Sequence, residues 1–209
     1  MAITATSDAT LHAGSAALMS EGRTGDVFAI RADVRRHEQV DQAIAAAVQR
    51  FGGIDILVNN AGVGIFKPVA DLAVDEWHTI VDTNLTGVFY CCRAALPHLR
   101  ARGGGWIVNI SSLSGKHPFA GAAAYCASKA GLNAFTDALM QEVRHDGIRV
   151  TCIMPGSVRT EFGARMPGGD DWRLAPDDVA QAVCDVIRHP TRSLPSAVEI
   201  RPSRPPKKS

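Results

Sequence analysis

Strand-like and helix-like segments alternate along most of this chain, and this alternation constrains the fold more than any other feature. A short apolar run at 27–30 precedes a segment in which apolar residues recur at helical spacing, from Val40 to Phe51. Two glycines follow that segment, and a second apolar run then covers 54–59. Strands that alternate with helices in this way form parallel sheets covered by helices on both faces. The sequence therefore predicts an α/β fold with a doubly wound parallel sheet.

The same alternation continues almost to the end of the chain. Three further strands and three further helices are expected, at 106–110, 148–153, 198–200, 74–100, 123–143 and 176–188. Pro176 supports the last helix, because proline is favoured at the first helical position. We expect a single domain over residues 1–201 and a disordered, Pro- and Lys-rich tail over 202–209.

Composition argues against several classes of function. The 209 residues include 22 Lys and Arg and 21 Asp and Glu, so there is no general electrostatic attraction to nucleic acid or to an anionic membrane. No apolar run approaches the about 18 residues that span a bilayer, and the N-terminus lacks the features of a signal peptide. The five cysteines show no metal-binding spacing, so no metal site is expected. Reduced thiols in a cytoplasmic protein are the expected state.

One pair of side chains suggests chemistry. Tyr125 and Lys129 are four residues apart in a predicted helix, so they lie on one face, one turn apart. An ammonium beside a phenol favours the phenolate and lowers the pKa of the tyrosine. Lowering that pKa from ~10 to ~7 requires about 4 kcal/mol of differential stabilisation. Such a tyrosine can exchange a proton with an alcohol oxygen near neutral pH. Alone, the pair is weak, because it occurs by chance on many helices.

Four other motifs surround this pair in a fixed order. They are Asn59-Asn60-Ala61-Gly62 after the strand at 54–59, Asn84 in the next helix, Ser112 after the strand at 106–110, and Pro155-Gly156-Ser157-Val158-Arg159-Thr160 after the strand at 148–153. The ordered set resembles the short-chain dehydrogenase/reductase family over about residues 27–162. The resemblance implies a Rossmann-like sheet. It also implies an NAD(P)-dependent oxidoreductase that interconverts a secondary alcohol and a ketone by hydride transfer.

The resemblance assigns a catalytic role to four residues. Tyr125 would be the acid/base, and Ser112 would hold the substrate oxygen against it. Lys129 would lower the pKa of Tyr125 and bind the nicotinamide ribose. Asn84 would fix a water that links Lys129 to solvent. Ser112, and not the adjacent Ser111, has the family's spacing to the tyrosine.

The resemblance also assigns coenzyme contacts. The carboxylate of Asp33, with Val34 next to it, would accept the adenine amino group. The backbone of Asn60, Ala61 and Gly62 would approach the ribose, because glycine leaves space there. The remaining expected contacts are Tyr125, Lys129, Pro155, Gly156, Val158 and Thr160, of which Val158 and Thr160 would contact the nicotinamide carboxamide.

The beginning of the chain departs from the family pattern. Residues 1–7 resemble the family's second strand and residues 8–20 the helix after it, and no Thr-Gly-x-x-x-Gly-x-Gly turn is found. The first strand is central in a sheet of order 3-2-1-4-5-6, so its neighbours would lie about 10 Å apart without it. We therefore expect in-frame sequence upstream that encodes this strand and turn.

The choice of coenzyme is read just after the second strand, where an acidic residue binds the ribose 2′-hydroxyl of NAD. Thr6 and Ser7 at this point favour NADP, while Asp8 one place later leaves NAD open. The segment 161–174, where the family places its substrate loop, is short and Gly-rich here and offers few anchors for a large ligand.

Other functions remain open within and beyond this family. One is a 3-oxoacyl-thioester reductase, although the chain lacks the Gly-Gly-containing final strand that many such reductases carry. Another is a catalytically inactive relative or fragment, because the phosphate-binding turn is missing. The expected partners are a small alcohol or ketone and further copies of this chain. The alanines and glycines in the helices at 74–100 and 123–143 favour close packing in a homodimer or homotetramer.

Overall fold

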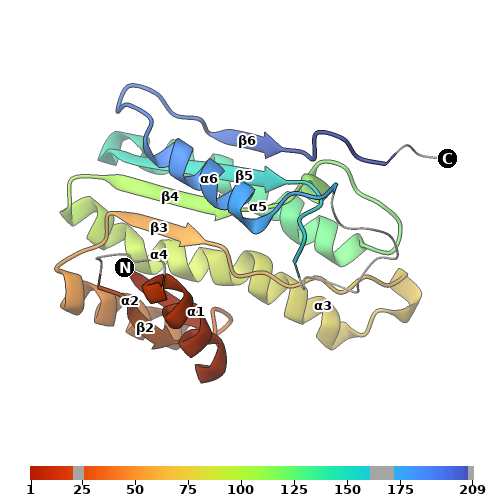
Figure 1. The fold of residues 1–209 in the computed structure, drawn as a ribbon, viewed down its shortest axis with the longest axis horizontal. Helices are drawn as coiled ribbons and strands as arrows, with labels where there is room; N and C mark the ends of the chain where they lie inside the picture. Colours follow the sequence, from red (N-terminus) through yellow and green to blue (C-terminus); the bar gives the residue numbers. More distant parts are fainter. Residues whose placement is uncertain (21–25, 161–171, 207–209) are drawn as a thin grey trace.

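Parallel strands with helices on both faces form the body of the molecule (Figure 1). The computed structural model describes residues 1–20, 26–160 and 172–206. The strands are β1 (Ala2–Ala5), β2 (Phe28–Arg31), β3 (Ile56–Asn59), β4 (Gly105–Ile110), β5 (Ile148–Pro155) and β6 (Ala197–Ile200). The α-helices are α1 (Asp8–Ser20), α2 (His37–Phe51), α3 (Val74–Val81), α4 (Gly87–Ala101), α5 (Ala123–Val143) and α6 (Pro176–Ile187). The predicted α/β, Rossmann-like architecture is confirmed.

The described strands fall into two sheets. β1 pairs with β2, and β3, β4, β5 and β6 pair in that order, all parallel. Thus β1 and β3, the expected neighbours of the family's first strand, are edge strands of separate sheets. The apolar side chains of Ile56 and Val58 on β3 remain 45% and 43% exposed. The existence of an upstream strand stays a prediction.

Local signals in the sequence set several helix ends. Gly52 ends α2 in the left-handed region at φ 78°, which glycine adopts without the cost that a Cβ would impose. Pro176 begins α6, and the Asp178 carboxylate accepts a hydrogen bond of 2.7 Å from the Ala175 backbone N–H. Glu76 accepts a similar bond from the Ala73 N–H at the start of α3. These helices are therefore capped by residues within or next to their own first and last turns.

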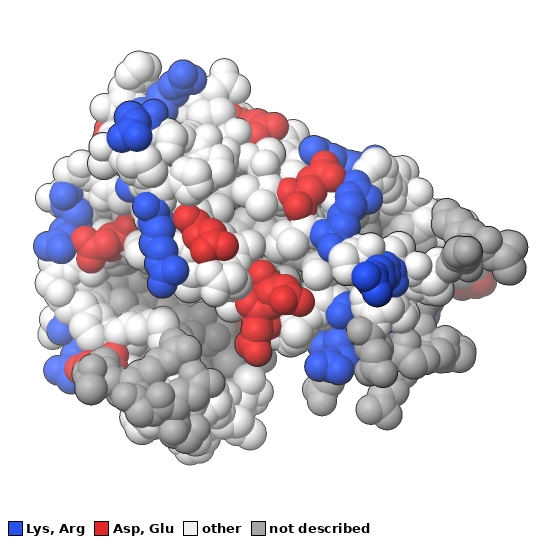
Figure 2. All heavy atoms as spheres, turned by 45° about the horizontal axis from the view of Figure 1, so that its top comes forward, with Lys and Arg blue, Asp and Glu red and all other residues white. Residues whose placement is uncertain are grey.

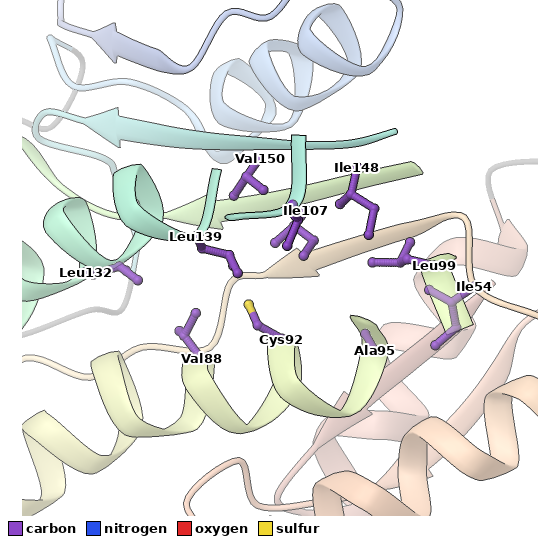
Figure 3. Close-up of a cluster of buried hydrophobic side chains, with 11 residues drawn as sticks. Ile54, Val88, Cys92, Ala95, Leu99, Ile107, Leu132, Leu139, Ile148 and Val150 are labelled. Carbon is purple, nitrogen blue, oxygen red and sulfur yellow. The ribbon is translucent and has the colours of Figure 1, made fainter. Parts of the chain in front are cut away.

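Two apolar clusters cover the two faces of the four-stranded sheet. The larger one joins β3, β4 and β5 to α4 and α5 (Figure 3). Ile107 belongs to it, whereas its neighbours Trp106 and Val108 belong to the second cluster, which Val186 of α6 completes. This alternation follows from the strand period of two, which sends successive side chains to opposite faces. The central strands are therefore buried on both sides, as a doubly wound sheet requires.

The helical segment expected at 74–100 contains a feature that the sequence did not predict. Residues Asp82–Thr86 form a π-helical turn between α3 and α4. Such turns are rare and occur often at functional sites. Trp77, which the periodicity placed on the apolar side of this segment, is 40% exposed.

The remaining expectations concern the tail and the cysteines. Residues 202–206 lie outside any helix or strand, and 207–209 lie outside the described residues. All five cysteines are free and at least partly buried. Across the described part of the chain, no helix combines the length and apolarity needed to cross a membrane. On the face seen in Figure 2, basic and acidic side chains are interspersed.

Candidate active site

The residues expected to carry chemistry gather at one edge of the four-stranded sheet. Because the strands are parallel, the carboxyl ends of β3, β4 and β5 share that edge. The segments after these strands begin at Asn60, Ser111 and Gly156, and α5 packs beside them. Ligands of open α/β sheets bind outside the carboxyl ends of the strands. This edge is therefore the candidate active site.

The two serines after β4 have separate roles. Ser111 donates to Asn133 Oδ1 at 2.6 Å and so ties β4 to α5. Ser112 begins the short helix η3 (Leu113–Gly115), where its Oγ accepts a hydrogen bond of 3.1 Å from the Ser114 N–H. Ser112 also hydrogen-bonds the Tyr125 side chain. The structure therefore separates a structural Ser111 from Ser112, the serine that the family spacing indicated.

Tyr125 lies in the first turn of α5 and is 8% exposed. Burial raises the pKa of its phenol, and the hydrogen bond with Ser112 lowers it by less. This direction is opposite to the sequence-based expectation, because burial is a tertiary property that the spacing of two residues does not report. Tyr125 is therefore a neutral phenol, and hence a proton donor, near pH 7.

Lys129 lies one turn further along α5 and is 4% exposed. Its Nζ is 5.9 Å from the centroid of the Tyr125 ring and donates to the Ile110 carbonyl at 2.9 Å. Burial lowers the pKa of this ammonium to about 8. An ammonium has three N–H donors, and the described contacts include one acceptor, so further donors can serve a bound hydroxyl.

Asn84 lies fully buried in the π-helical turn. Its Oδ1 accepts from the Val63 N–H at 2.8 Å, and its Nδ2 donates to the Val63 carbonyl at 2.9 Å. The same Nδ2 donates to Ser128 Oγ at 3.0 Å, which in turn donates to the Tyr125 carbonyl. Asn84 thus joins the loop after β3 to the helix that carries Tyr125. Both of its N–H donors are engaged, and its expected role toward a water stays a prediction.

Gly62 leaves open the approach to these buried groups. A Cβ built at this position would lie 3.4 Å from Asn84 Oδ1 and 3.7 Å from Lys129 Nζ. Any larger side chain would therefore cover the ammonium. Asn60 and Ala61, directly before Gly62, are exposed. A buried cation with spare donors, reached past a glycine, fits the hydroxyls of a ribose, so the chain's residues fit the nicotinamide coenzyme that the resemblance implies.

Asp33 follows β2 and already has a partner. The Arg35 guanidinium and backbone N–H donate to its carboxylate, with distances of 2.6 to 3.1 Å. The hydrogen bonds and charge of Arg35 lower the pKa of Asp33. Val34 packs against Gly87 of α4, where an added Cβ would meet it at 2.9 Å. The adenine contact expected of Asp33 stays a prediction, and its carboxylate would have to be shared with Arg35.

The segment after β5 brings a further loop to the same edge. Pro155 ends the strand, and Gly156 lies so close to Leu113 and Pro202 that a Cβ would approach both at 3.1 to 3.3 Å. Val158 forms a parallel bridge with Leu174, while Thr160 is exposed. Of the segment 161–174, residues 161–171 lie outside the described residues. The positions of Gly156 and Val158 agree with a site at this edge, and their coenzyme contacts stay predictions.

Sequence reasoning missed a buried polar network beneath the site. Asn59 Nδ2 donates to Asn109 Oδ1 at 2.8 Å, and Asn109 Nδ2 donates to Thr136 Oγ1 at 2.9 Å. The network joins paired positions of β3 and β4 to α5. The signal available in the sequence was an asparagine inside each of two apolar strands, since a buried amide requires a partner.

Comparisons with known proteins agree with this geometry. A family model described as short chain dehydrogenase matches residues 1–168. An uncharacterised oxidoreductase of Staphylococcus aureus (strain MRSA252) is 35% identical over 176 residues, which cover 84% of this chain and 76% of that protein.

Two solved structures are similar over nearly the whole chain. One is an alcohol dehydrogenase from the archaeon Thermococcus sibiricus, complexed with 5-hydroxy-NADP, with a TM-score of 0.88 and 28% identity over 99% of this chain and 88% of the other. The second is a metagenomic short-chain oxidoreductase in complex with NADP, with a TM-score of 0.83 and 31% identity over 98% of this chain and 86% of the other. The family match, the fold and the arrangement of Ser112, Tyr125 and Lys129 lead to one conclusion: this chain belongs to the short-chain dehydrogenase family.

Proposed function

We propose that this oxidoreductase uses NAD(P) to interconvert a secondary alcohol and a ketone, with Tyr125 as the acid/base. The observation that carries the proposal is the position of the Tyr125 phenol, buried and hydrogen-bonded to Ser112 beside the ammonium of Lys129. When bound, the nicotinamide coenzyme supplies or accepts the hydride. The protein supplies the position of the substrate and the proton.

In the direction of reduction, Tyr125 donates its phenolic proton to the carbonyl oxygen of the substrate. Ser112 donates a second hydrogen bond to the same oxygen, which stabilises the negative charge that develops there. The raised pKa of Tyr125 supports this direction, since the phenol is protonated at neutral pH. The Tyr125 phenolate left by this step takes up one proton from solvent before the next turnover, and Lys129 holds ribose hydroxyls with its spare donors.

A substitution at Tyr125 tests the proposal. Tyr125→Phe keeps the ring and its packing but removes the proton, so turnover should fall by ~10²–10⁴. Coenzyme binding, measured by titration, should change little. Lys129→Met should reduce both turnover and coenzyme affinity. Near-normal turnover by Tyr125→Phe on the best substrate would show that Tyr125 is not the acid/base.

We further propose that NADP is the preferred coenzyme. Arg31, at the end of β2, donates to the Thr6 carbonyl at 3.1 Å and lies 3.6 Å from the Asp8 carboxylate. Its guanidinium is therefore beside the point where the 2′-substituent is expected, and it is largely exposed. Ser7 offers a hydroxyl at the same place, where it also caps α1 through the Thr10 N–H. A guanidinium favours a 2′-phosphate over a neutral hydroxyl.

Arg31→Ala tests the coenzyme preference. The Kd of NADPH should rise about 10-fold, the loss expected for one charge-assisted hydrogen bond, whereas the Kd of NADH should stay within twofold. Asp8→Asn is the matched variant, and it should strengthen NADPH binding by removing a negative charge. Equal effects of Arg31→Ala on both coenzymes would contradict the preference for NADP.

A further inference from the structure

Two exposed phenylalanine rings lie next to Tyr125. The Phe66 ring meets the Tyr125 ring edge to face, with centroids 5.5 Å apart at 70°. The Phe119 ring stacks on Phe66, with centroids 6.1 Å apart at 29°. Phe66 and Phe119 are 41% and 53% exposed. We call this pair the aromatic surface.

The aromatic surface is not part of either apolar cluster of the fold. Phe66 lies in the loop between β3 and the short helix η1 (Val69–Asp71), and Phe119 lies between η3 and α5. Both loops follow the carboxyl ends of parallel strands, where an α/β scaffold places its binding residues. Other aromatic pairs of the described chain also include exposed rings, but this pair touches the tyrosine that carries the chemistry.

The charged side chains next to these rings in the sequence are occupied by one another. Lys67 contacts the Glu76 carboxylate at 2.5 Å. Lys116 and Arg201 both contact Glu199, at 2.9 and 2.8 Å, and the Arg201 guanidinium is 3.1 Å from His117 Nε2. These contacts hold the pKa of Glu199 down to about 2, so the carboxylate stays ionised as the partner of both cations. The side of Tyr125 formed by Phe66 and Phe119 therefore offers an aromatic surface, since the cations next to these rings are already paired with carboxylates.

We propose that Phe66 and Phe119 determine substrate specificity by stacking against an aromatic substituent on the reacting carbon. The proposal rests on the function proposed above and names its substrate class as aryl-substituted secondary alcohols and aryl ketones. A planar ring of the substrate can stack on this pair, because aromatic faces attract one another in offset geometry. Such stacking would not disturb the ion pairs described above. The edge contact between Phe66 and Tyr125 places such a substituent next to the phenol.

The test compares two ketones that differ in the substituent, acetophenone and propanone. Phe119→Ala should lower kcat/KM for acetophenone by about 5–10-fold, the range expected for one lost ring pair. The kcat/KM for propanone should stay within twofold. Phe119→Tyr keeps the ring, so this variant should retain the kcat/KM that the wild-type chain has for acetophenone. We choose Phe119 because its described ring contact is with Phe66 and not with Tyr125.

Phe51→Ala is the matched control. Phe51, the last residue of α2, is 39% exposed, and among the described residues its ring pairs with that of Phe28 on β2. Phe51→Ala should leave kcat/KM unchanged for both acetophenone and propanone. Two results for Phe119→Ala would overturn the proposal: equal losses of kcat/KM on both ketones, or an unchanged kcat/KM for acetophenone. In either case, turnover of propanone that depends on Tyr125 would leave the proposed function intact.

A binding measurement separates the two proposals if turnover is absent. Saturation-transfer difference NMR with acetophenone should show transfer to the ring protons in the wild-type chain and in Phe51→Ala. In Phe119→Ala the transfer at the same acetophenone concentration should be weaker, and its dependence on acetophenone concentration should give a Kd about 5–10-fold higher. No transfer in the wild-type chain would overturn the aromatic surface as a binding site, whatever the fate of the catalytic assignment.

Discussion

Gly115→Ala should damage catalysis without touching any group that reacts. Gly115 is the last residue of η3, the short helix that Ser112 begins. A Cβ at this position would lie 2.7 Å from Asn133 Nδ2 and 2.8 Å from both the carbonyl carbon and the oxygen of Lys129. The contacted backbone is in the middle of α5 and has little freedom to move. The η3 segment must therefore retreat by about 0.7 Å or more to regain ordinary van der Waals contact.

This retreat should move Ser112 away from Tyr125. Misplacement by about 1 Å can lower a rate by 10²-fold, so we expect kcat/KM on the best substrate to fall between about 10- and 100-fold. The overpacking itself should lower the free energy of unfolding by about 1–3 kcal/mol, measured by urea denaturation. Steady-state kinetics well below the melting temperature separates the two effects.

Gly53→Ala is the control for a clash of the same size. Its Cβ would lie 2.7 Å from Cδ of Arg102, but that side chain is half exposed and can move away. Stability should change by less than about 0.5 kcal/mol, and kcat/KM should be unchanged. Normal kcat/KM in Gly115→Ala would refute the reasoning, since it would mean that contact with α5 does not position Ser112.

Three further predictions concern the buried lysine, the polar network and assembly. Burial lowers the pKa of Lys129 from 10.5 to about 8, so between these values the unfolded chain binds more protons and stability should rise with pH. Relative to Lys129→Met, the gain from pH 8 to pH 10 should be about 2 kcal/mol by urea unfolding, and parallel pH profiles would show that the ammonium is not buried. Asn109→Leu leaves the Asn59 amide without its oxygen acceptor and should cost about 1–3 kcal/mol; a loss below 0.5 kcal/mol would mean that the network adds little. Exposed alanines on α5 and the exposed Phe89 on α4 support the expected homodimer or homotetramer, although Ala95 of α4 is buried within the subunit; light scattering at micromolar concentration should give a dimer or tetramer, whereas the mass of one subunit would reject it.

The features that could be predicted are those determined by neighbours in the sequence. The helix α5 has the predicted bounds 123–143, and Gly52 ends α2 as expected. The family resemblance, through its spacing of serine to tyrosine, indicated Ser112, and the structure places this serine in a hydrogen bond with Tyr125. Local patterns therefore sufficed for these helix bounds, whereas the family resemblance was needed to choose the serine.

The features that could not be predicted depend on contacts between distant segments. The π-helical turn at Asn84 accompanies hydrogen bonds to Val63, 21 residues earlier. The direction of the Tyr125 pKa follows from how deeply the folded chain buries the phenol. The stacking of Phe66 on Phe119 joins two loops that no periodicity relates.

The division of the strands into two sheets has a consequence for local opening. A two-stranded sheet is only marginally stable by itself, and β1–β2 depends on α2, whose Ile44 and Val48 pack against the larger apolar cluster. Amide hydrogens of β1 and β2 should therefore exchange through openings of lower free energy than those of β4 and β5. A ligand that contacts both Asp33 and Lys129 would act as a clamp across the two units. The apparent affinity of that ligand would then include the free energy needed to close the β1–β2 unit. A higher coenzyme concentration would therefore make the opening of the β1–β2 unit less frequent.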